Sequence, residues 1–306
     1  MKPIWLKSYP PGIPAEINVD EYRSVGDVFT KTVEKFGPRT AFVNMGTGIS
    51  YSELDRLSRN FGAYLQSVLK LHRGARVALM MPNLLQYPVA MFGALRSGYT
   101  AVNCNPLYSP RELAYQLKDS GAEAIVIVEN FANVLAQAIE TTQVKHVITT
   151  QIGDLLGFPH RELVNFVVKY VKRMVPTWNI PGAVPLRTAL ARGANAPWTP
   201  PEIGHDDLAF LQYTGGTTAG RKGSRQDQSD VARAWPPRRR LSRARKLGGV
   251  RRSRRYAQLA AGRRCRARHR RALRRGVRTN RRQSGAQSGR RPARARCGAQ
   301  SRALYT

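Results

Sequence analysis

The sequence predicts an α/β fold in which a parallel or mixed sheet is flanked by helices. Between residues 76 and 149, short apolar segments that suit strands alternate at least three times with segments that suit helices. One of them, Ala-Ile-Val-Ile-Val at 124–128, contains no polar residue, as expected for a strand that is buried on both faces. This alternation is typical of a sheet with helices on both sides.

Before residue 76, the sequence predicts an extended arm, a hairpin and two helices. Pro10, Pro11 and Pro14 exclude a regular helix in the first twenty residues. A helix is expected at 24–36, and two short strands at 41–44 and 49–51. Ser-Glu-Leu-Asp at 52–55 is a capping-box pattern, and apolar residues recur behind it at helical spacing: Leu54, Leu57, Phe61, Leu65 and Val68.

From residue 76 on, the pattern predicts a regular series of elements. Ser109 and Glu112 form a second capping box, with Pro110 at the first helical position. The expected strands are 76–81, 100–103, 124–128 and 146–149. The expected helices are 84–95, 110–118 and 131–140. Residues 153–201 are less regular, apart from a basic amphipathic helix at 163–174, which is either an ordinary surface helix or a contact with an anionic membrane surface.

A glycine- and threonine-rich segment follows an apolar strand that is expected at 208–213. It contains Thr214, Gly215, Gly216, Thr217, Thr218 and, a little further on, Lys222. Glycines let the backbone N–H groups approach a ligand, threonine hydroxyls add donors, and a lysine adds positive charge. These residue types predict a phosphate-binding loop, and the alternative is an ordinary turn.

Several blocks of residues resemble the bacterial long-chain fatty-acyl-CoA synthetases, which are adenylate-forming, AMP-binding enzymes. The blocks follow one another in the order of that family and cover residues 1–218 almost continuously. They are 42–46, 77–90, 103–113, 124–128, 164–170 and 210–218. The resemblance implies a large multilayer N-terminal domain, of which this chain carries the first part as residues 1–222.

The resemblance also implies the chemistry. Members of the family join a fatty acid to ATP, form an acyl-AMP and pass the acyl group to coenzyme A, with Mg²⁺ as the metal. The ATP phosphate loop would consist of Tyr213, Thr214, Gly215, Gly216, Thr217, Thr218 and Lys222. The family has glycine where this chain has Ala219, and nothing after Gly223 matches. The adenine motif, the acidic ribose motif and the lysine of the small domain have no counterpart, so no catalytic residue is identified.

Residues 223–306 have a different composition from the rest of the chain. They hold 28 of the 51 Lys and Arg residues but only 2 of the 19 Asp and Glu residues, and they contain no Phe, Ile or Met. Such a segment cannot form a hydrophobic core, and we expect it to be a disordered basic tail. One interpretation is a nucleic-acid-binding arm, and the other is out-of-frame translation of a GC-rich gene that leaves a truncated, inactive ligase.

The remaining signals are few. Three cysteines without CxxC spacing and five scattered histidines predict neither a disulfide framework nor a metal site. The N-terminus has no apolar core of a signal peptide, and the most apolar stretch is interrupted by Pro82, Asn83 and Pro88. The expected location is therefore cytoplasmic, with peripheral contact with the inner membrane as an additional possibility.

Overall fold

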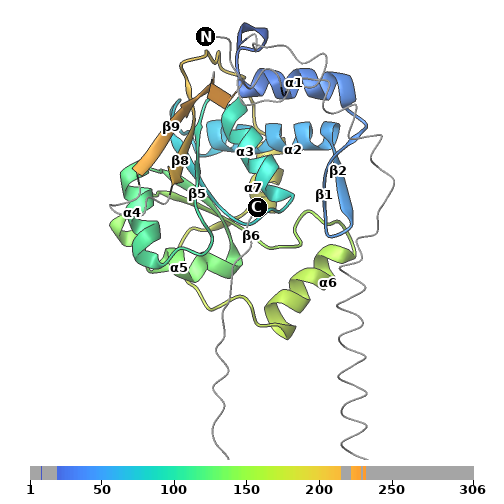
Figure 1. The fold of residues 1–306 in the computed structure, drawn as a ribbon. Helices are drawn as coiled ribbons and strands as arrows, with labels where there is room; N and C mark the ends of the chain where they lie inside the picture. The colour runs from blue at the N-terminus through green and yellow to red at the C-terminus, as the bar shows by residue number, and fades with distance from the viewer. Residues whose placement is uncertain (1–7, 9–18, 215–221, 229, 232–306) are drawn as a thin grey trace, which may run out of the picture. The chain divides into compact units, whose positions relative to one another are not determined.

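The computed structural model of the chain describes residue 8 and residues 19–214, 222–228, 230 and 231. In these ranges the chain forms a seven-stranded sheet with helices on both faces and a separate two-stranded sheet (Figure 1). The strands are β1 (Thr40–Asn44), β2 (Thr47–Ser50), β3 (Arg76–Met80), β4 (Thr100–Asn103), β5 (Ala124–Val128), β6 (His146–Thr150), β7 (Val184–Pro185), β8 (Leu208–Thr214) and β9 (Lys222–Asp227). The α-helices are α1 (Val25–Phe36), α2 (Tyr51–Ala63), α3 (Gln86–Arg96), α4 (Pro110–Ser120), α5 (Ala132–Ala136), α6 (His160–Phe166) and α7 (Leu186–Ala194).

The large sheet has the strand order β7-β6-β5-β3-β4-β8-β9. All neighbouring strands are parallel except β8 and β9, which are antiparallel. The predicted α/β class with a mixed sheet is therefore confirmed. Because successive parallel strands need crossover connections, the helices between them cover both faces.

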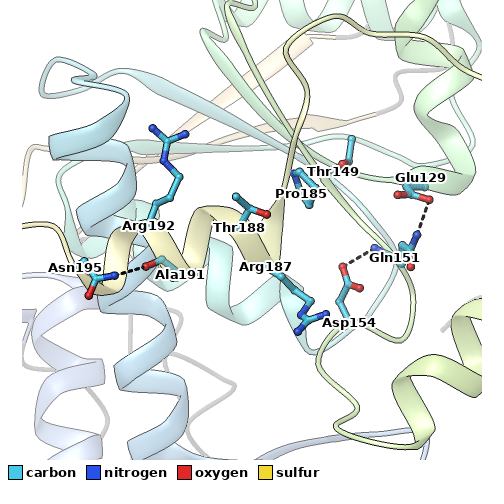
Figure 2. Close-up of a pocket in the computed structure, with 10 residues that line it drawn as sticks. All are labelled: Glu129, Thr149, Gln151, Asp154, Pro185, Arg187, Thr188, Ala191, Arg192 and Asn195. Atoms are coloured by element: carbon cyan, nitrogen blue, oxygen red, sulfur yellow. Dashed lines mark hydrogen bonds between the residues drawn. The ribbon is translucent and has the colours of Figure 1, made fainter.

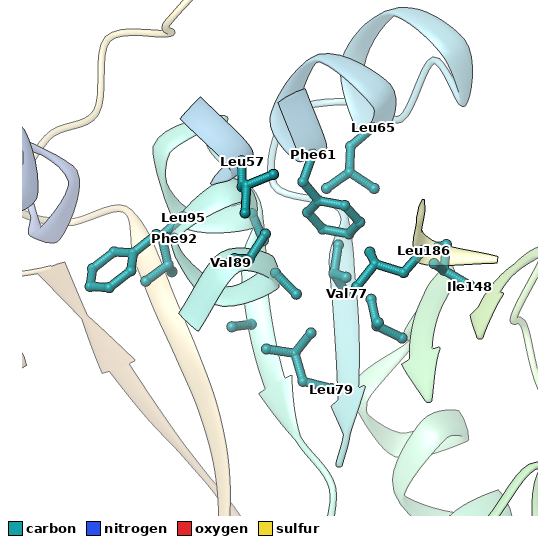
Figure 3. Packing of buried hydrophobic residues seen from close by; sticks show 14 of the residues in the cluster. Leu57, Phe61, Leu65, Val77, Leu79, Val89, Phe92, Leu95, Ile148 and Leu186 are labelled. Carbon is teal, nitrogen blue, oxygen red and sulfur yellow. The ribbon is translucent and has the colours of Figure 1, made fainter. Parts of the chain in front are cut away.

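Alternate residues of β3 face two different hydrophobic clusters. Val77 and Leu79 pack with residues of α2 and α3, including Phe61 (Figure 3), whereas Ala78 and Met80 pack with residues of α4 and α5. All four strand residues are at most 1% exposed. Burial on both faces explains why this strand is a continuous apolar run without alternation.

The predicted cap of the second helix was wrong by two residues. The N-cap of α2 is Ser50, whose Oγ accepts a hydrogen bond from the backbone N–H of Glu53 at 3.1 Å. Ser50 stands three residues before Glu53, which is the spacing that a capping box requires, and Ser52 lies inside the helix. The second box was predicted correctly: Ser109 and Glu112 cap each other reciprocally, with Pro110 in the first turn.

One predicted helix was too long, and another was shifted along the chain. Of residues 131–140, only Ala132–Ala136 are α-helical, and 3₁₀ turns lie on either side. No side chain caps α5, whose N-cap is Phe131, and the nearby Asn130 amide donates to the Met174 carbonyl oxygen at 2.9 Å. The helix predicted at 163–174 begins earlier, at His160, and continues through the π-helical turn η6 (Val167–Val171). It ends before Arg173, which has a positive φ of 49°.

The segment predicted as irregular contains β7 and α7. The sequence signal was present, since Leu186, Ala189, Leu190 and Gly193 recur at helical spacing and are all buried. Gly193 is where α7 crosses α2 closely. A Cβ atom added at Gly193 would lie 1.9 Å from the backbone oxygen of Asn60.

We expect Gly193→Ala to lower the free energy of unfolding by about 1–3 kcal/mol, because the two helices must separate to admit the methyl group. This loss should outweigh the better helix propensity of alanine. The measurement is a urea titration followed by circular dichroism. Gly204→Ala is the matched control, since a Cβ atom there meets nothing within 4 Å. Equal stability of the two variants would contradict the close crossing.

The sheet continues beyond residue 222, into the segment for which the sequence predicts a tail without regular structure. β9 pairs with β8 along its length, from Thr214 opposite Lys222 to Leu208 opposite Asp227. Main-chain hydrogen bonds to an existing strand require no apolar side chains, which is why the polar sequence Lys-Gly-Ser-Arg-Gln-Asp occupies this edge position. Gln228 then accepts a hydrogen bond from Val25 N at 2.9 Å through its side-chain oxygen. Residues 232–306 lie outside the described residues.

Candidate functional site

The predicted phosphate loop leaves the sheet at the carboxyl end of β8. Tyr213 and Thr214 are the last residues of β8, and Lys222 is the first residue of β9. Backbone pairing of Thr214 with Lys222 brings the two ends of the loop together. Gly215, Gly216, Thr217 and Thr218 lie outside the described residues. Since β8 is parallel to β4, the loop emerges at the edge where ligands bind in parallel α/β sheets.

Tyr213 connects this strand to helix α4. Its hydroxyl donates to Asp119 Oδ2 at 2.5 Å, across 94 residues of sequence. Burial raises the pKa of Tyr213, and the hydrogen bond and the negative charge of Asp119 raise the pKa further. Tyr213, the first residue of the predicted loop, is therefore held as a neutral phenol.

We expect Tyr213→Phe to lower the free energy of unfolding at pH 7 by about 1 kcal/mol, because one hydrogen bond is lost. The folded-state pKa of Tyr213 lies above its unfolded-state value of about 10, so the stabilisation is present below pH 10 and is lost as the pH rises through the folded-state value. Urea titrations at pH 7, 9, 10 and 11 should show the difference between the two proteins shrinking above pH 10. A difference that stays constant up to pH 11 would contradict the assigned hydrogen bond.

Three polar side chains form a chain of hydrogen bonds beside the same strand ends. The Tyr87 hydroxyl donates to Asn103 Oδ1 at 2.9 Å, and Asn103 Nδ2 donates to Gln212 Oε1 at 3.0 Å. Asn103 and Gln212 are direct neighbours on β4 and β8. Gln116 Nε2 donates to the Asn103 carbonyl oxygen at 2.8 Å, while Gln116 Oε1 is buried without a partner among the described residues.

This hydrogen-bond chain fixes the end of β8 two residues before the loop begins. None of its members was predicted as a site residue. The available signal was Asn103, a polar residue at the carboxyl end of an otherwise apolar predicted strand. Its partner on β8 could not be found from the sequence, because the pairing depends on the order of the strands.

A cavity of about 660 Å³ lies at the carboxyl ends of β5, β6 and β7 (Figure 2). The first turn of α7 forms one wall with Arg187 and Thr188, and Glu129 lies on the opposite side. Gln151 Nε2 donates to Glu129 Oε2 at 3.0 Å, and Gln151 N donates to Asp154 Oδ2 at 2.8 Å. The lining residues are Glu129, Thr149, Gln151, Asp154, Pro185, Arg187, Thr188, Ala191, Arg192 and Asn195.

The lining of this cavity is electrically balanced, with two guanidinium groups and two carboxylates. Arg187 points toward Asp154, whereas Arg192 points away from it and lies over the Tyr64 ring, with 5.7 Å from the guanidinium carbon to the ring centroid. The two arginines therefore do not converge on one anion.

The described part of the chain contains neither a cluster of metal-binding side chains nor a reactive thiol. No group of three or more His, Cys, Asp or Glu residues there could hold a metal ion. Cys104 is buried, and burial raises the pKa of its thiol to about 12, so the thiolate nucleophile is not available near neutral pH. None of the helices in the described ranges is long and apolar enough to cross a membrane.

Comparison with known proteins decides the family. The sequence model of the AMP-binding enzyme family matches residues 29–233, which is more than half of the chain. The chain belongs to the AMP-binding enzyme family. The predicted resemblance is thereby confirmed, and the β8 loop lies within the matched part of this AMP-binding chain.

The relatives of this AMP-binding chain include bacterial long-chain-fatty-acid–CoA ligases. The ligase of Escherichia coli O157:H7 is 54% identical over 224 residues, which cover 73% of this chain and 40% of the relative. The ligase of Haemophilus influenzae is also 54% identical over 224 residues. The chain thus spans about two-fifths of the length of the curated relatives that it matches.

Solved structures agree with the fold. The anthranilate–CoA ligase AuaEII in complex with anthranoyl-AMP matches with a TM-score of 0.57 at 17% identity, over 70% of this chain and 37% of that chain. A long-chain-fatty-acid–CoA ligase from Archaeoglobus fulgidus matches with a TM-score of 0.54 at 21% identity, over 73% of this chain and 40% of that chain. The AMP-binding chain therefore has the architecture of the first part of these enzymes.

Proposed function

We propose that this chain represents the first part of an enzyme that activates long-chain fatty acids with ATP and transfers them to coenzyme A through an acyl-AMP. The observation that supports this most strongly is 54% identity to long-chain-fatty-acid–CoA ligases over 224 residues of this chain. The position of the glycine- and threonine-rich loop at the carboxyl end of β8 agrees with it.

In this proposal the loop from Tyr213 to Lys222 holds the β- and γ-phosphates of ATP while the fatty-acid carboxylate attacks the α-phosphorus. Backbone N–H groups, threonine hydroxyls and one lysine offset the charge of the phosphates without bonding the reacting atom. Tyr213 and Gln212 position the loop through their bonds to Asp119 and Asn103. Mg²⁺ and coenzyme A are further proposed ligands, for which the described residues supply no identified site.

For the chain as printed, we propose that the family's activity is missing. Residues 223–306 contain no Tyr-Gly-x-Thr-Glu adenine motif, and Ala219 replaces the family's glycine in the loop. Purified chain is expected to show no palmitate-dependent ATP–pyrophosphate exchange above background. Exchange that Lys222→Ala abolishes would contradict this expectation.

The loop itself is tested by ATP binding. We expect Lys222→Ala to weaken ATP binding, measured by equilibrium dialysis, about tenfold or more, because one charge-assisted hydrogen bond to phosphate is lost. Lys246→Ala is the matched control, since Lys246 is the single lysine of residues 223–306 and contributes only to non-specific attraction. Equal affinities of the two variants would contradict the assignment of Lys222 to the phosphate loop.

We propose that residues 1–222 form the AMP-binding part and residues 223–306 a tail of different origin. The support is the distribution of charge, since the net charge is +6 before Gly223 and +26 from Gly223 onward. The first residues of the tail nevertheless belong to strand β9 of the sheet. A second candidate function is non-specific nucleic-acid binding by the tail. The nucleotide sequence around codons 215–225 separates the two origins, since a ligase sequence continuing in another frame would exclude a dedicated nucleic-acid-binding arm.

We further propose a cytoplasmic location with peripheral contact between residues 163–174 and the inner membrane. The support is the surface of this segment, on which Lys169 and Lys172 accompany Phe166 and Tyr170 at exposed positions. Fractionation of cells into cytosol and membrane, followed by a high-salt wash, tests the location. Recovery in the cytosol alone would contradict peripheral contact.

A further inference from the structure

The helical segment of α6 and η6 exposes its large apolar side chains. Neither element contains a buried residue. Five side chains between residues 163 and 174, which we call the α6 face, are between 51% and 64% exposed: Leu163, Phe166, Tyr170, Val171 and Met174. Monomeric proteins rarely gather so many large apolar side chains on one exposed element without an interaction partner.

The protein-facing side of this segment includes Val164, which packs against the hydrophobic core, and Asn165. Asn165 is turned toward the protein, where its Oδ1 accepts from Gly153 N at 2.7 Å and its Nδ2 donates to Asp154 Oδ1 at 3.3 Å. Phe166 and Tyr170 are turned outward and lie against each other, with their ring centroids 5.3 Å apart. Val164 and Asn165 therefore face the protein, while the aromatic pair faces outward.

Three cations accompany the α6 face. Lys169, Lys172 and Arg173 are all exposed, and none of them forms an ion pair with a carboxylate in the described ranges. The ammonium group of Lys169 lies 5.9 Å from the centre of the Tyr170 ring, so charge and aromatic surface are adjacent. Glu162, the one acidic residue between 160 and 174, pairs with Arg161.

We propose that the α6 face inserts Phe166 and Tyr170 between anionic lipid headgroups, while Lys169, Lys172 and Arg173 bind the headgroup phosphates. This inference rests on the proposed peripheral contact and specifies its lipid class and its residues. Exposed aromatic and aliphatic side chains beside lysine and arginine are the composition of helices that lie in the membrane interface. Attraction to anionic lipids adds to the binding with each nearby cation.

A protein partner fits the α6 face and its three cations less well than an anionic lipid surface does. A protein partner that covered the apolar side chains would also bury the cations, and burying unpaired charges is costly. A second copy of this chain would place the same three cations opposite one another, which is repulsive. An anionic lipid surface satisfies both the charges and the apolar side chains.

The test measures the fluorescence of a tryptophan introduced at the α6 face of the full chain, in the absence of ATP and fatty acid. Phe166→Trp is mixed with vesicles of phosphatidylcholine alone, or of phosphatidylcholine with phosphatidylglycerol, that carry brominated acyl chains as quenchers. The wild-type emission is subtracted. Tyr115→Trp is the matched control, because Tyr115 on α4 is an aromatic residue of similar exposure, 49% against 56% for Phe166. The basic residues 223–306 are common to all variants, so differences between them report the α6 face.

We expect the emission of Phe166→Trp to move to shorter wavelength and to be quenched by the phosphatidylglycerol vesicles, and the emission of Tyr115→Trp to remain unchanged. Adding Lys169→Gln and Lys172→Gln should raise the lipid concentration for half-maximal quenching severalfold. Equal quenching of both tryptophans, or quenching independent of phosphatidylglycerol, would overturn the proposal. A spectral shift without lipid that grows with protein concentration would assign the α6 face to a second copy. Since no substrate is used, these outcomes are independent of the proposed ligase function.

Discussion

Asp55→Ala is expected to lower the free energy of unfolding by about 3–5 kcal/mol, because it leaves a buried arginine without its counter-charge. Asp55 Oδ1 lies 2.8 Å from the guanidinium of Arg96, whose side chain is only 7% exposed. Burial lowers the pKa of Arg96, and the charge of Asp55 counteracts this effect. Ser58 Oγ, at 2.9 Å from Arg96 Nη1, is neutral and cannot replace the carboxylate.

Glu53→Ala, a matched change in the same helix, shows whether the loss of stability comes from the burial of the charge or from the loss of any ion pair. Glu53 pairs with Arg56 on the surface, where the two side chains are 43% and 59% exposed. Because exposed pairs contribute little, Glu53→Ala should change the stability by less than about 1 kcal/mol. Urea titrations of both variants provide the comparison. A loss for Asp55→Ala no larger than that for Glu53→Ala would show that Arg96 reaches water when its partner is removed.

Phe61→Ala is the second change with a large expected effect. It should lower the free energy of unfolding by about 3–5 kcal/mol, because apolar contacts are removed and a cavity is left behind. Phe61 on α2 is fully buried and packs among Leu57, Leu65, Val77 and Val89 (Figure 3). Helices α2 and α3 cross here at Gly93, where an added Cβ atom would lie 2.9 Å from Phe61 Cδ1. The rigid backbone at this crossing limits how far the cavity can close.

Phe42→Ala provides the control for the loss of a phenyl ring. Phe42 lies on β1 and is 42% exposed, so its removal should change the stability by less than about 1 kcal/mol. Thermal unfolding followed by circular dichroism should give Phe61→Ala a far lower midpoint temperature than either Phe42→Ala or the wild type. Similar midpoints for the two variants would mean that the α2–α3 core repacks around the missing ring.

Most of the fold could be predicted from the sequence because its signals are local. The strand at 124–128 is apolar throughout. Ser109 and Glu112, which are only three residues apart, form the capping box that marks the start of α4. Errors arose where two local signals competed, as with Ser50 and Ser52 before α2, or where an element was as short as β7. The predicted phosphate loop also rests on a local signal, and its four central residues lie outside the described ranges.

By itself, the sequence determined the α/β class, the AMP-binding resemblance and the change of composition at Gly223, since each depends on residues that are close together in the chain. Only the tertiary structure decided which side chains hold the loop. Tyr213 bonds to Asp119 on α4 across 94 residues of sequence. Gln212 bonds to Asn103 across 109 residues, because the strand order places β8 beside β4. The tertiary structure also decided that Phe166 and Tyr170 face outward, because Val164 and Asn165 of the same segment contact the protein. Contacts of this kind depend on how the elements pack, and no spacing along the chain encodes them.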